Sequence, residues 1–297
     1  MVETRSQQEI NRVRKRPITI PTIIKWLRKL FAYVLLLITL GSMAFPLVWM
    51  VLSSFKTERE MLSFPPTFFP REWSLKAYQA VLQTDFLIWF KNSMTVSIAA
   101  TITAVTVSAF GAYALSRSRN RGVQWFSKIV LFTYLIPTIL LLIPIFRIVV
   151  NLQLSNSLGG LIVVYNSILL PYGLWTLRSY FAGIPHEIEE AARIDGATRF
   201  QAFYKVVLPQ ALPGLVSTAL FAFNVCWNEY LFAVILIGSG KKWTLNPGIA
   251  SLVGALSDQS WTVVMAASTL ATVPVIILFS LLQRYWIAGW GGGAVKG

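Results

Sequence analysis

The side chains best suited to chemistry lie close together near residue 226, within a long apolar stretch. Asn224 and Asn228 are four residues apart, so on a helix they share one face. Trp227 lies between them, and Glu229 is the only carboxylate within the long apolar stretches. Amide and carboxyl groups bind hydroxyls and an indole ring covers an apolar face, so this cluster predicts non-covalent binding of a polyhydroxylated solute. Interhelical hydrogen bonds and an aromatic belt at the membrane surface would use the same residue types, and both interpretations stay open.

Covalent catalysis is poorly supported by the residue types present. The chain has one histidine, His186, and one cysteine, Cys226, which argues against an embedded zinc or haem site. The position of the only histidine, at 186, gives no support to a Ser–His–Asp arrangement either. A phosphate-binding loop requires G-x-x-x-x-G-K-[ST]. The nearest segment, 235–242, has Ile235 at its first position and Lys242 at its last. We therefore expect no catalytic residue, no metal ligand and no cofactor in this chain, and expect it not to be an enzyme.

The composition of the 297 residues indicates a membrane protein that must hold these side chains in helices. The chain is 55% hydrophobic and 13% charged, whereas soluble domains are about 25% charged. The apolar residues gather into stretches of about 20, enough for a helix to cross ~30 Å of hydrocarbon. Six transmembrane helices are predicted, at 30–52, 93–115, 126–149, 158–177, 213–237 and 263–282. The fold class is therefore an all-α membrane protein, with Glu229 inside a continuous fifth helix.

The basic residues divide unequally between the two sides of these spans. One side carries 18 of the 26 lysines and arginines, including the run at 12–16. The positive-inside rule therefore places both termini in the cytoplasm, and the net charge of +14 becomes a topology signal, not a sign of nucleic-acid binding. Residues 1–29 form a basic cytoplasmic segment that contacts membrane lipid, followed by a membrane domain at 30–297 whose first span is an uncleaved anchor. Outside, 53–88 form a cap with a short helix near 75–82.

The longest cytoplasmic loop, 178–212, has the local signals of a folded helical hairpin. Pro185 suits a first helical position, and Glu187 and Glu189 favour the positive end of a helix dipole. Gly196 suits a left-handed residue that ends this helix. These signals occur together, which an unstructured connector would not require.

A second helix follows directly in the same loop. Thr198 and Gln201 fit a capping box, and an apolar stripe repeats at helical spacing before Leu208 and Pro209 end the helix. The stripe consists of Phe200, Phe203, Tyr204 and Val207. From the residues alone, the hairpin either packs on its own spans or docks a cytoplasmic partner.

The spacing of residues in this loop resembles the EAA loop of ABC importer permeases. That pattern is E-A-A, three residues, G, nine residues, a hydrophobic residue, any residue, then L-P. The matching residues are Glu190, Ala191, Ala192, Gly196, Val206, Leu208 and Pro209, with Asp195 in a form common in that family. The resemblance covers the six-span layout, most closely 89–284. Segments 227–230 and 291–297 resemble the carbohydrate-type, maltose-permease-like branch.

This resemblance implies a type I ABC importer permease fold with a cytoplasmic coupling-helix hairpin. ATPase docking would use Glu190, Ala191, Ala192, Asp195, Gly196, Leu208 and Pro209, and the substrate pathway would use Asn224, Trp227, Asn228 and Glu229. Partners would be a second permease subunit, in a heterodimer, two copies of an ABC ATPase that bind ATP and magnesium, and an external substrate-binding protein. The chain would carry a sugar or oligosaccharide across a bacterial inner membrane.

Other functions remain open from the sequence. A permease of the same kind for a polyol or glycerol phosphate would share every feature above. An ion-coupled secondary carrier would need several titratable groups at membrane depth, where this chain has only Glu229. A membrane-embedded enzyme would need paired titratable groups there.

Overall fold

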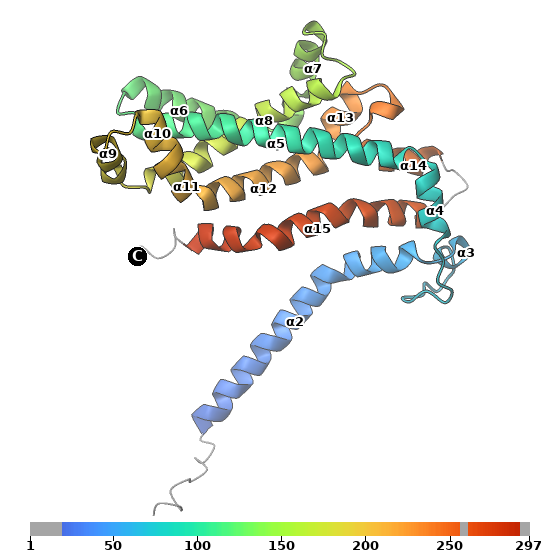
Figure 1. Ribbon diagram of the computed structural model, residues 1–297. Coiled ribbons are helices and arrows are strands. Elements are labelled where there is room, and N and C mark those ends of the chain that lie inside the picture. Colours follow the sequence, from blue (N-terminus) through green and yellow to red (C-terminus); the bar gives the residue numbers. More distant parts are fainter. Residues whose placement is uncertain (1–19, 256–260, 292–297) are drawn as a thin grey trace, which may run out of the picture. The chain divides into compact units, whose positions relative to one another are not determined.

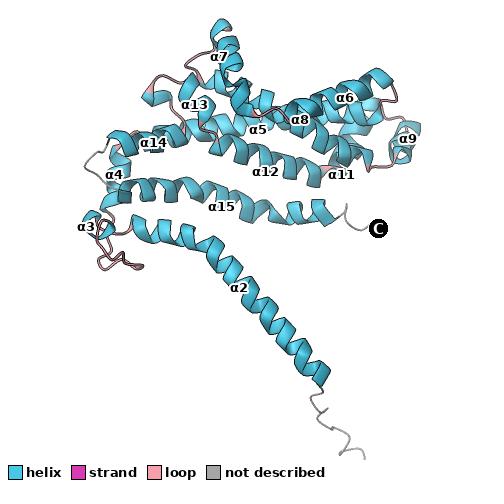
Figure 2. Cartoon of the chain, turned by 180° about the vertical axis from the view of Figure 1, so that it is seen from behind, coloured by secondary structure: helices cyan, strands magenta, loops and turns pink. Residues whose placement is uncertain are grey.

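The computed structural model describes residues 20–255 and 261–291, and every regular element within them is a helix (Figures 1 and 2). The basic run at 12–16 and residues 292–297 of the glycine-rich tail lie outside the described residues. The chain divides into two compact units, Met1–Val51 and Leu52–Gly297. Four helices are long and apolar enough to cross a membrane, and six spans result if each of two bent pairs counts as one. The predicted all-α class is confirmed.

Helix α2 (Ile20–Ser54) contains the predicted first span. Its segment Lys25–Ser54 has a mean hydropathy of 2.2, and the most apolar part of it is not buried within the chain. Large apolar side chains such as Phe31, Leu37 and Met43 are all more than half exposed. A helix that is apolar on all sides is stable only where lipid or another chain covers it.

The second unit is built on four helices, α5 (Phe86–Arg117), α8 (Leu158–Ala182), α12 (Leu212–Asn228) and α15 (Trp261–Gly291). Helix α5 packs against α8 and α12, and α12 packs against α15, as both ribbon views show. Helices α5, α8 and α15 contain the predicted second, fourth and sixth spans, which are therefore confirmed.

Small residues bring α5 and α8 close together. Ala100, Ala104 and Ser108 of α5 are buried against α8. On α8, a Cβ atom placed on Gly173 would lie 2.4 Å from Ser108 Oγ, well inside van der Waals contact. Small side chains at membrane helix interfaces permit this approach of the backbones.

The third predicted span, 126–149, is not one helix. The structure has α6 (Arg121–Tyr134), the 3₁₀ turn η1 (Thr138–Leu141) and α7 (Leu142–Asn151), with a bend of 96° between the two arms. Pro137 lies at the break. Proline cannot donate a backbone hydrogen bond, and it disfavours helical geometry in the preceding residue, so the helix ends before it.

The fifth predicted span, 213–237, is also broken. Helix α12 ends at Asn228, and the short helix α13 (Leu231–Leu236) begins after two intervening residues. Glu229 therefore lies between two helices, which corrects its predicted position within a continuous helix.

The connecting segments contain α3 (Glu58–Met61), α4 (Lys76–Gln83), η3 (Gly240–Lys242) and α14 (Leu245–Ala255). Helix α4 confirms the short helix predicted near 75–82. Glu60 organises the loop before it, because its Oε1 accepts hydrogen bonds from Thr67 Oγ1 at 2.6 Å and from the Arg71 N–H at 2.9 Å. Burial raises the pKa of Glu60, but these hydrogen bonds and the charge of Lys56 outweigh it, so the pKa lies below its ordinary value.

The α5–α8 contact yields a stability prediction. Replacing Gly173 with valine should force the two helices apart, because the added Cβ meets Ser108, and overpacking of this kind costs about 1–3 kcal/mol. The midpoint of thermal aggregation of the detergent-purified protein should fall by several degrees. Gly159→Val is the matched control, since a Cβ atom placed on Gly159 would have nothing within 4 Å. An equal midpoint for both variants would contradict the packing described.

Candidate functional site

The hairpin predicted from the loop sequence is present at residues 185–210, at the end of the bundle where α5 finishes (Figure 1). It consists of α9 (His186–Ile194), α10 (Arg199–Ala202), the π-helical turn η2 (Phe203–Val207) and α11 (Leu208–Gln210). Pro185 is the N-cap of α9, one residue before its predicted position, and Gly196 has the predicted left-handed backbone with φ of 91°. The Thr198–Gln201 capping box is confirmed, with bonds of 3.2 and 2.8 Å.

Helix α9 presents most of its surface outward, and none of its residues is buried. Glu190, Ala191 and Asp195 are exposed, and Ala192 is partly buried. Ile194 is 86% exposed and was not among the predicted site residues. It lies three residues after Ala191, so the two share one side of the helix. The exposed side of α9 thus combines acidic groups with an apolar strip, as a docking surface for another protein requires.

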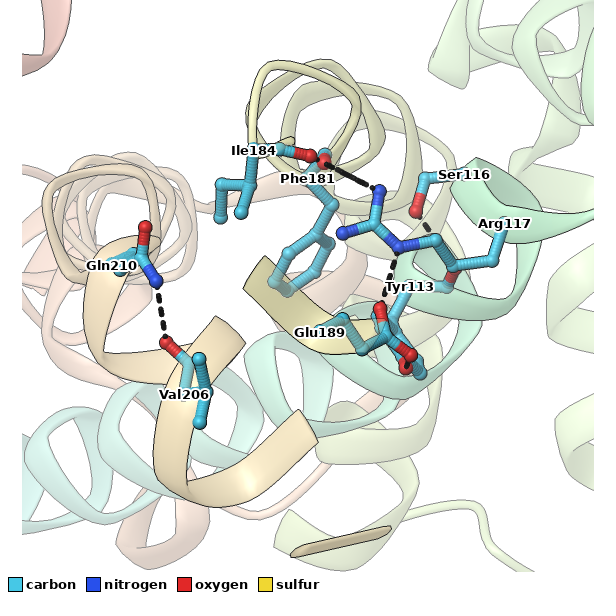
Figure 3. A network of polar contacts seen from close by, with 8 residues as sticks. All are labelled: Tyr113, Ser116, Arg117, Phe181, Ile184, Glu189, Val206 and Gln210. Carbon is cyan, nitrogen blue, oxygen red and sulfur yellow. Dashed lines mark hydrogen bonds and ion pairs between the residues drawn. The ribbon is translucent and has the colours of Figure 1, made fainter. Parts of the chain in front are cut away.

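One arginine attaches α9 to the membrane helices (Figure 3). Arg117, the last residue of α5, donates from Nε to Glu189 Oε2 at 2.9 Å. Its Nη1 donates to the carbonyl oxygens of Phe181 at 3.1 Å and Ile184 at 3.4 Å. The Tyr113 hydroxyl donates to the other carboxylate oxygen of Glu189. We call this group the Arg117 clamp; it joins α5, the end of α8 and α9.

The second arm of the hairpin is attached by apolar contact. Phe203 is buried against Tyr113 and Phe181, with ring centroids 4.5 and 6.1 Å away, and Val207 is fully buried. These two residues of the predicted apolar stripe therefore pack on the chain's own spans. The other two members of the stripe, Phe200 and Tyr204, are 63% and 62% exposed.

Pro209 does not end this arm, contrary to the prediction. The Leu208 N–H donates to the Phe203 carbonyl five residues earlier, and the arm continues to Gln210. Gln210 donates from its side chain to the Val206 carbonyl at 3.1 Å (Figure 3). A π-turn is wider than an α-turn and leaves room for a proline ring that would clash with an α-helical carbonyl. The bend to α12, 74°, occurs after Gln210 instead.

The break between α12 and α13 is satisfied by side chains. The Glu229 carboxylate accepts hydrogen bonds from the N–H groups of Phe232 at 2.8 Å and Ala233 at 3.1 Å, which caps α13. It also accepts one from the Tyr165 hydroxyl of α8 at 2.8 Å. Asn246 of α14 donates to the Glu229 carbonyl at 3.3 Å. This predicted pathway carboxylate is therefore engaged by the chain itself.

A cavity of about 460 Å³ opens beside this break, between α12, α14 and α15. Two of its lining residues, Asn224 and Asn228, share one face as predicted, and Asn228 Nδ2 donates to Asn224 Oδ1 at 2.9 Å. The full lining is Asn224, Trp227, Asn228, Asn246, Ile249, Ala250, Val253, Ser268, Ala271, Thr272 and Val275. We call it the amide cavity; its polar lining residues among those described are all uncharged.

Trp227 lies at the edge of the amide cavity and not fully within it. Its ring is 3% exposed and stacks on Phe223 at a centroid distance of 5.5 Å. Its Nε1 donates to the Ala271 carbonyl at 3.1 Å. The indole therefore packs mainly in the interior and joins α12 to α15.

Sequence reasoning missed four residues that organise these sites, namely Tyr113, Arg117, Tyr165 and Asn246. Arg117 entered the sequence interpretation only as a topology charge. A weak signal existed, since Tyr113 and Arg117 are four residues apart and share a face at the end of a span. Across residues 20–255 and 261–291, no three His, Cys, Asp or Glu residues gather in a way that could hold a metal ion.

Several known proteins are similar to this chain in sequence and in fold. Residues 104–289 match the family described as binding-protein-dependent transport system inner membrane component. The chain is 37% identical to the inner membrane ABC transporter permease protein YcjP of Escherichia coli (strain K12), over 85% of this chain and 91% of that protein. It is 34% identical to the trehalose/maltose transport system permease protein MalG of Thermococcus litoralis, over 85% of this chain and 91% of that protein.

A solved structure agrees with these relatives. A chain of a bacterial ABC transporter involved in the import of the acidic polysaccharide alginate superposes with a TM-score of 0.76 at 28% identity, covering 88% of this chain and 96% of that one. The resemblance first seen in the 190–209 loop is thereby confirmed, and so is the importer permease fold. The chain is a multi-pass inner-membrane protein and belongs to the family of binding-protein-dependent transport system inner membrane components.

Proposed function

We propose that this chain carries a sugar or oligosaccharide through the membrane, driven by a separate ATPase that docks on α9. The observation that supports this most is the form of the hairpin. Helix α9 starts after Pro185, is stopped by Gly196 and is fixed to two spans, yet buries none of its own residues. A helix held this firmly and left uncovered is suited to transmit force from a partner.

The energy source and the remaining partners follow from what the chain holds. Its sequence has no phosphate-binding loop, so two copies of an ABC ATPase would bind ATP and magnesium. An external binding protein would deliver the solute. Membership of this transporter family supports a second permease subunit beside this chain, together with membrane lipid. The excess of basic residues at the hairpin side supports cytoplasmic termini.

Each docking residue has a distinct role in this proposal. Glu190 and Asp195 offer carboxylates to basic groups of the ATPase, while the small Ala191 and Ala192 permit close approach. Gly196 allows the sharp turn back to α10. Leu208 and Pro209 connect this arm to α12. Closure of the two ATPases would draw the coupling helices together and swing the spans from inward-open to outward-open.

The amide cavity is the proposed solute pathway of this chain. Asn224 and Asn228 offer amide groups that both donate to and accept from sugar hydroxyls. Asn246, Ser268 and Thr272 extend that polar surface from α14 and α15. Trp227 gives an apolar edge, and Glu229 holds the pathway helix in place. The lining favours a neutral solute, in keeping with the trehalose/maltose permease among the relatives.

An anionic solute, such as an acidic sugar or glycerol phosphate, is the alternative that one observation favours. The similar solved transporter imports the acidic polysaccharide alginate. An anion in a membrane pathway needs cationic or N–H partners. The described lining of the amide cavity has no lysine or arginine, so the neutral solute is the better match. A neutral polyol would fit the same lining.

The docking proposal predicts a defined loss. Glu190→Lys and Gly196→Asp should each lower solute uptake at least tenfold in proteoliposomes that contain the permeases, ATPase and binding protein. The first reverses a contact charge, and the second strains a backbone at φ 91°. Co-purification of the ATPase should also fall. Lys91→Glu, a reversal at the opposite end of α5, should leave co-purification unchanged; normal coupled uptake in both hairpin variants would exclude docking on α9.

The pathway proposal predicts a separate effect. Asn228→Leu should raise the solute concentration for half-maximal uptake about fivefold, because one lost hydrogen bond costs about 1 kcal/mol. ATPase co-purification should stay normal. Thr133→Val, on exposed α6, is the control. Competition with neutral oligosaccharides and with their uronate counterparts then identifies the solute class, and stronger inhibition by the uronates would contradict the neutral assignment.

A further inference from the structure

We infer that Arg117 is a positioning residue for transport, because it makes the ATPase-docking helix move as one body with α5 and α8. This inference rests on the proposed docking of an ATPase on α9. Arg117 does not face that partner, since it lies at the base of α9, between the helix and the spans (Figure 3). Glu190 and Asp195 would contact the ATPase, and Arg117 would transmit the resulting displacement of α9 to α5 and α8.

The geometry of the Arg117 clamp supports this role. A single guanidinium reaches three segments, since Nε binds Glu189 of α9 and Nη1 binds the carbonyls of Phe181, in α8, and Ile184, in the linker. Phe181 lies in the last turn of α8, where the negative end of the helix dipole favours a cation. The planar fork of arginine can hold these directions at once, and the point charge of lysine cannot.

The surroundings make the contact stiff. The side chains of Arg117 and Glu189 are only 12% and 13% exposed, so water and salt screen their attraction weakly. Tyr113 adds a second hydrogen bond to Glu189 and packs on Phe181 and Phe203, with centroids at 5.9 and 4.5 Å. Removal of either charge would leave the other partly buried and unpaired, which is costly.

Helix α9 depends on this contact more than the second arm of the hairpin does. The second arm is held by buried Phe203 and Val207. Helix α9 buries no residue, and its hydrogen bonds to the spans are made by Glu189. Without the clamp, a docked ATPase could displace α9 while α5 and α8 remain in place, so ATP would be hydrolysed without transport.

The test measures solute uptake per ATP hydrolysed in proteoliposomes with the ATPase, second permease and binding protein. Arg117→Gln and Glu189→Gln should each retain the ATPase on purification but lower uptake per ATP at least tenfold. The double variant should be no worse than either single variant, because both remove one contact. Arg119→Gln, an exposed neighbour, should leave the ratio unchanged.

A second set of variants separates positioning from simple stability. Leu161→Ala, in the buried core of α8, should lower thermal stability and the amount of complex but leave uptake per ATP unchanged. Arg117→Lys and Tyr113→Phe perturb the clamp mildly and should lower uptake per ATP about two- to fivefold. These two variants test the inference if the Arg117→Gln chain does not assemble with its partners.

Two results would overturn the inference. One is uptake per ATP within twofold of the wild type in assembled Arg117→Gln and Glu189→Gln complexes. The other, if those complexes do not assemble, is an unchanged ratio in both mild variants. Failure of the proposed function is distinguishable, because the wild-type chain would then retain no ATPase and Glu190→Lys would have no effect on uptake.

Discussion

Hydrocarbon offers no hydrogen-bond partner, so each break in a membrane helix must be satisfied by the chain itself. The break between α12 and α13 shows how strongly this constraint shapes the protein. The Glu229 carboxylate accepts hydrogen bonds from two N–H groups in the first turn of α13 and from the Tyr165 hydroxyl of α8. Asn246 of α14 donates to the carbonyl oxygens of Trp227 and Glu229. Satisfying one interruption therefore ties two other helices, α8 and α14, to it, and the amide cavity opens beside it between α12, α14 and α15.

The same requirement operates at the opposite end of the bundle. Helix α8 ends with carbonyls that need donors, and Arg117 supplies them while it also binds Glu189. A span end and the base of α9 thus share one cation. The aromatic contacts of Tyr113 and Phe203 lie directly beside it. Polar and apolar contacts together attach the hairpin to the spans, as the proposed force transmission would require.

The sequence predicted the features that depend on neighbouring residues. Caps, dipole-matched carboxylates and the left-handed Gly196 lie within one or two turns of the helices they define, so the hairpin could be recognised. The Arg117–Glu189 contact joins residues 72 apart, and the Tyr165–Glu229 contact joins residues 64 apart. Local patterns contain no information on such pairs. Hydropathy also remained high across residue 230, which concealed the interruption, and Pro209 was taken as an end because a π-turn has no sequence signature.

The amide lining has a consequence for how selectivity is divided. An amide donates and accepts, and a hydroxyl rotates to do either, so almost any ring stereochemistry can find a match on such a surface. Asn224, Asn228 and Asn246 would therefore act as a permissive conduit, indifferent to which epimer or linkage passes. If the solute passes through this cavity as proposed, recognition of one particular sugar would fall to the external binding protein that delivers it, and exchanging that binding protein would change the imported sugar without altering this chain.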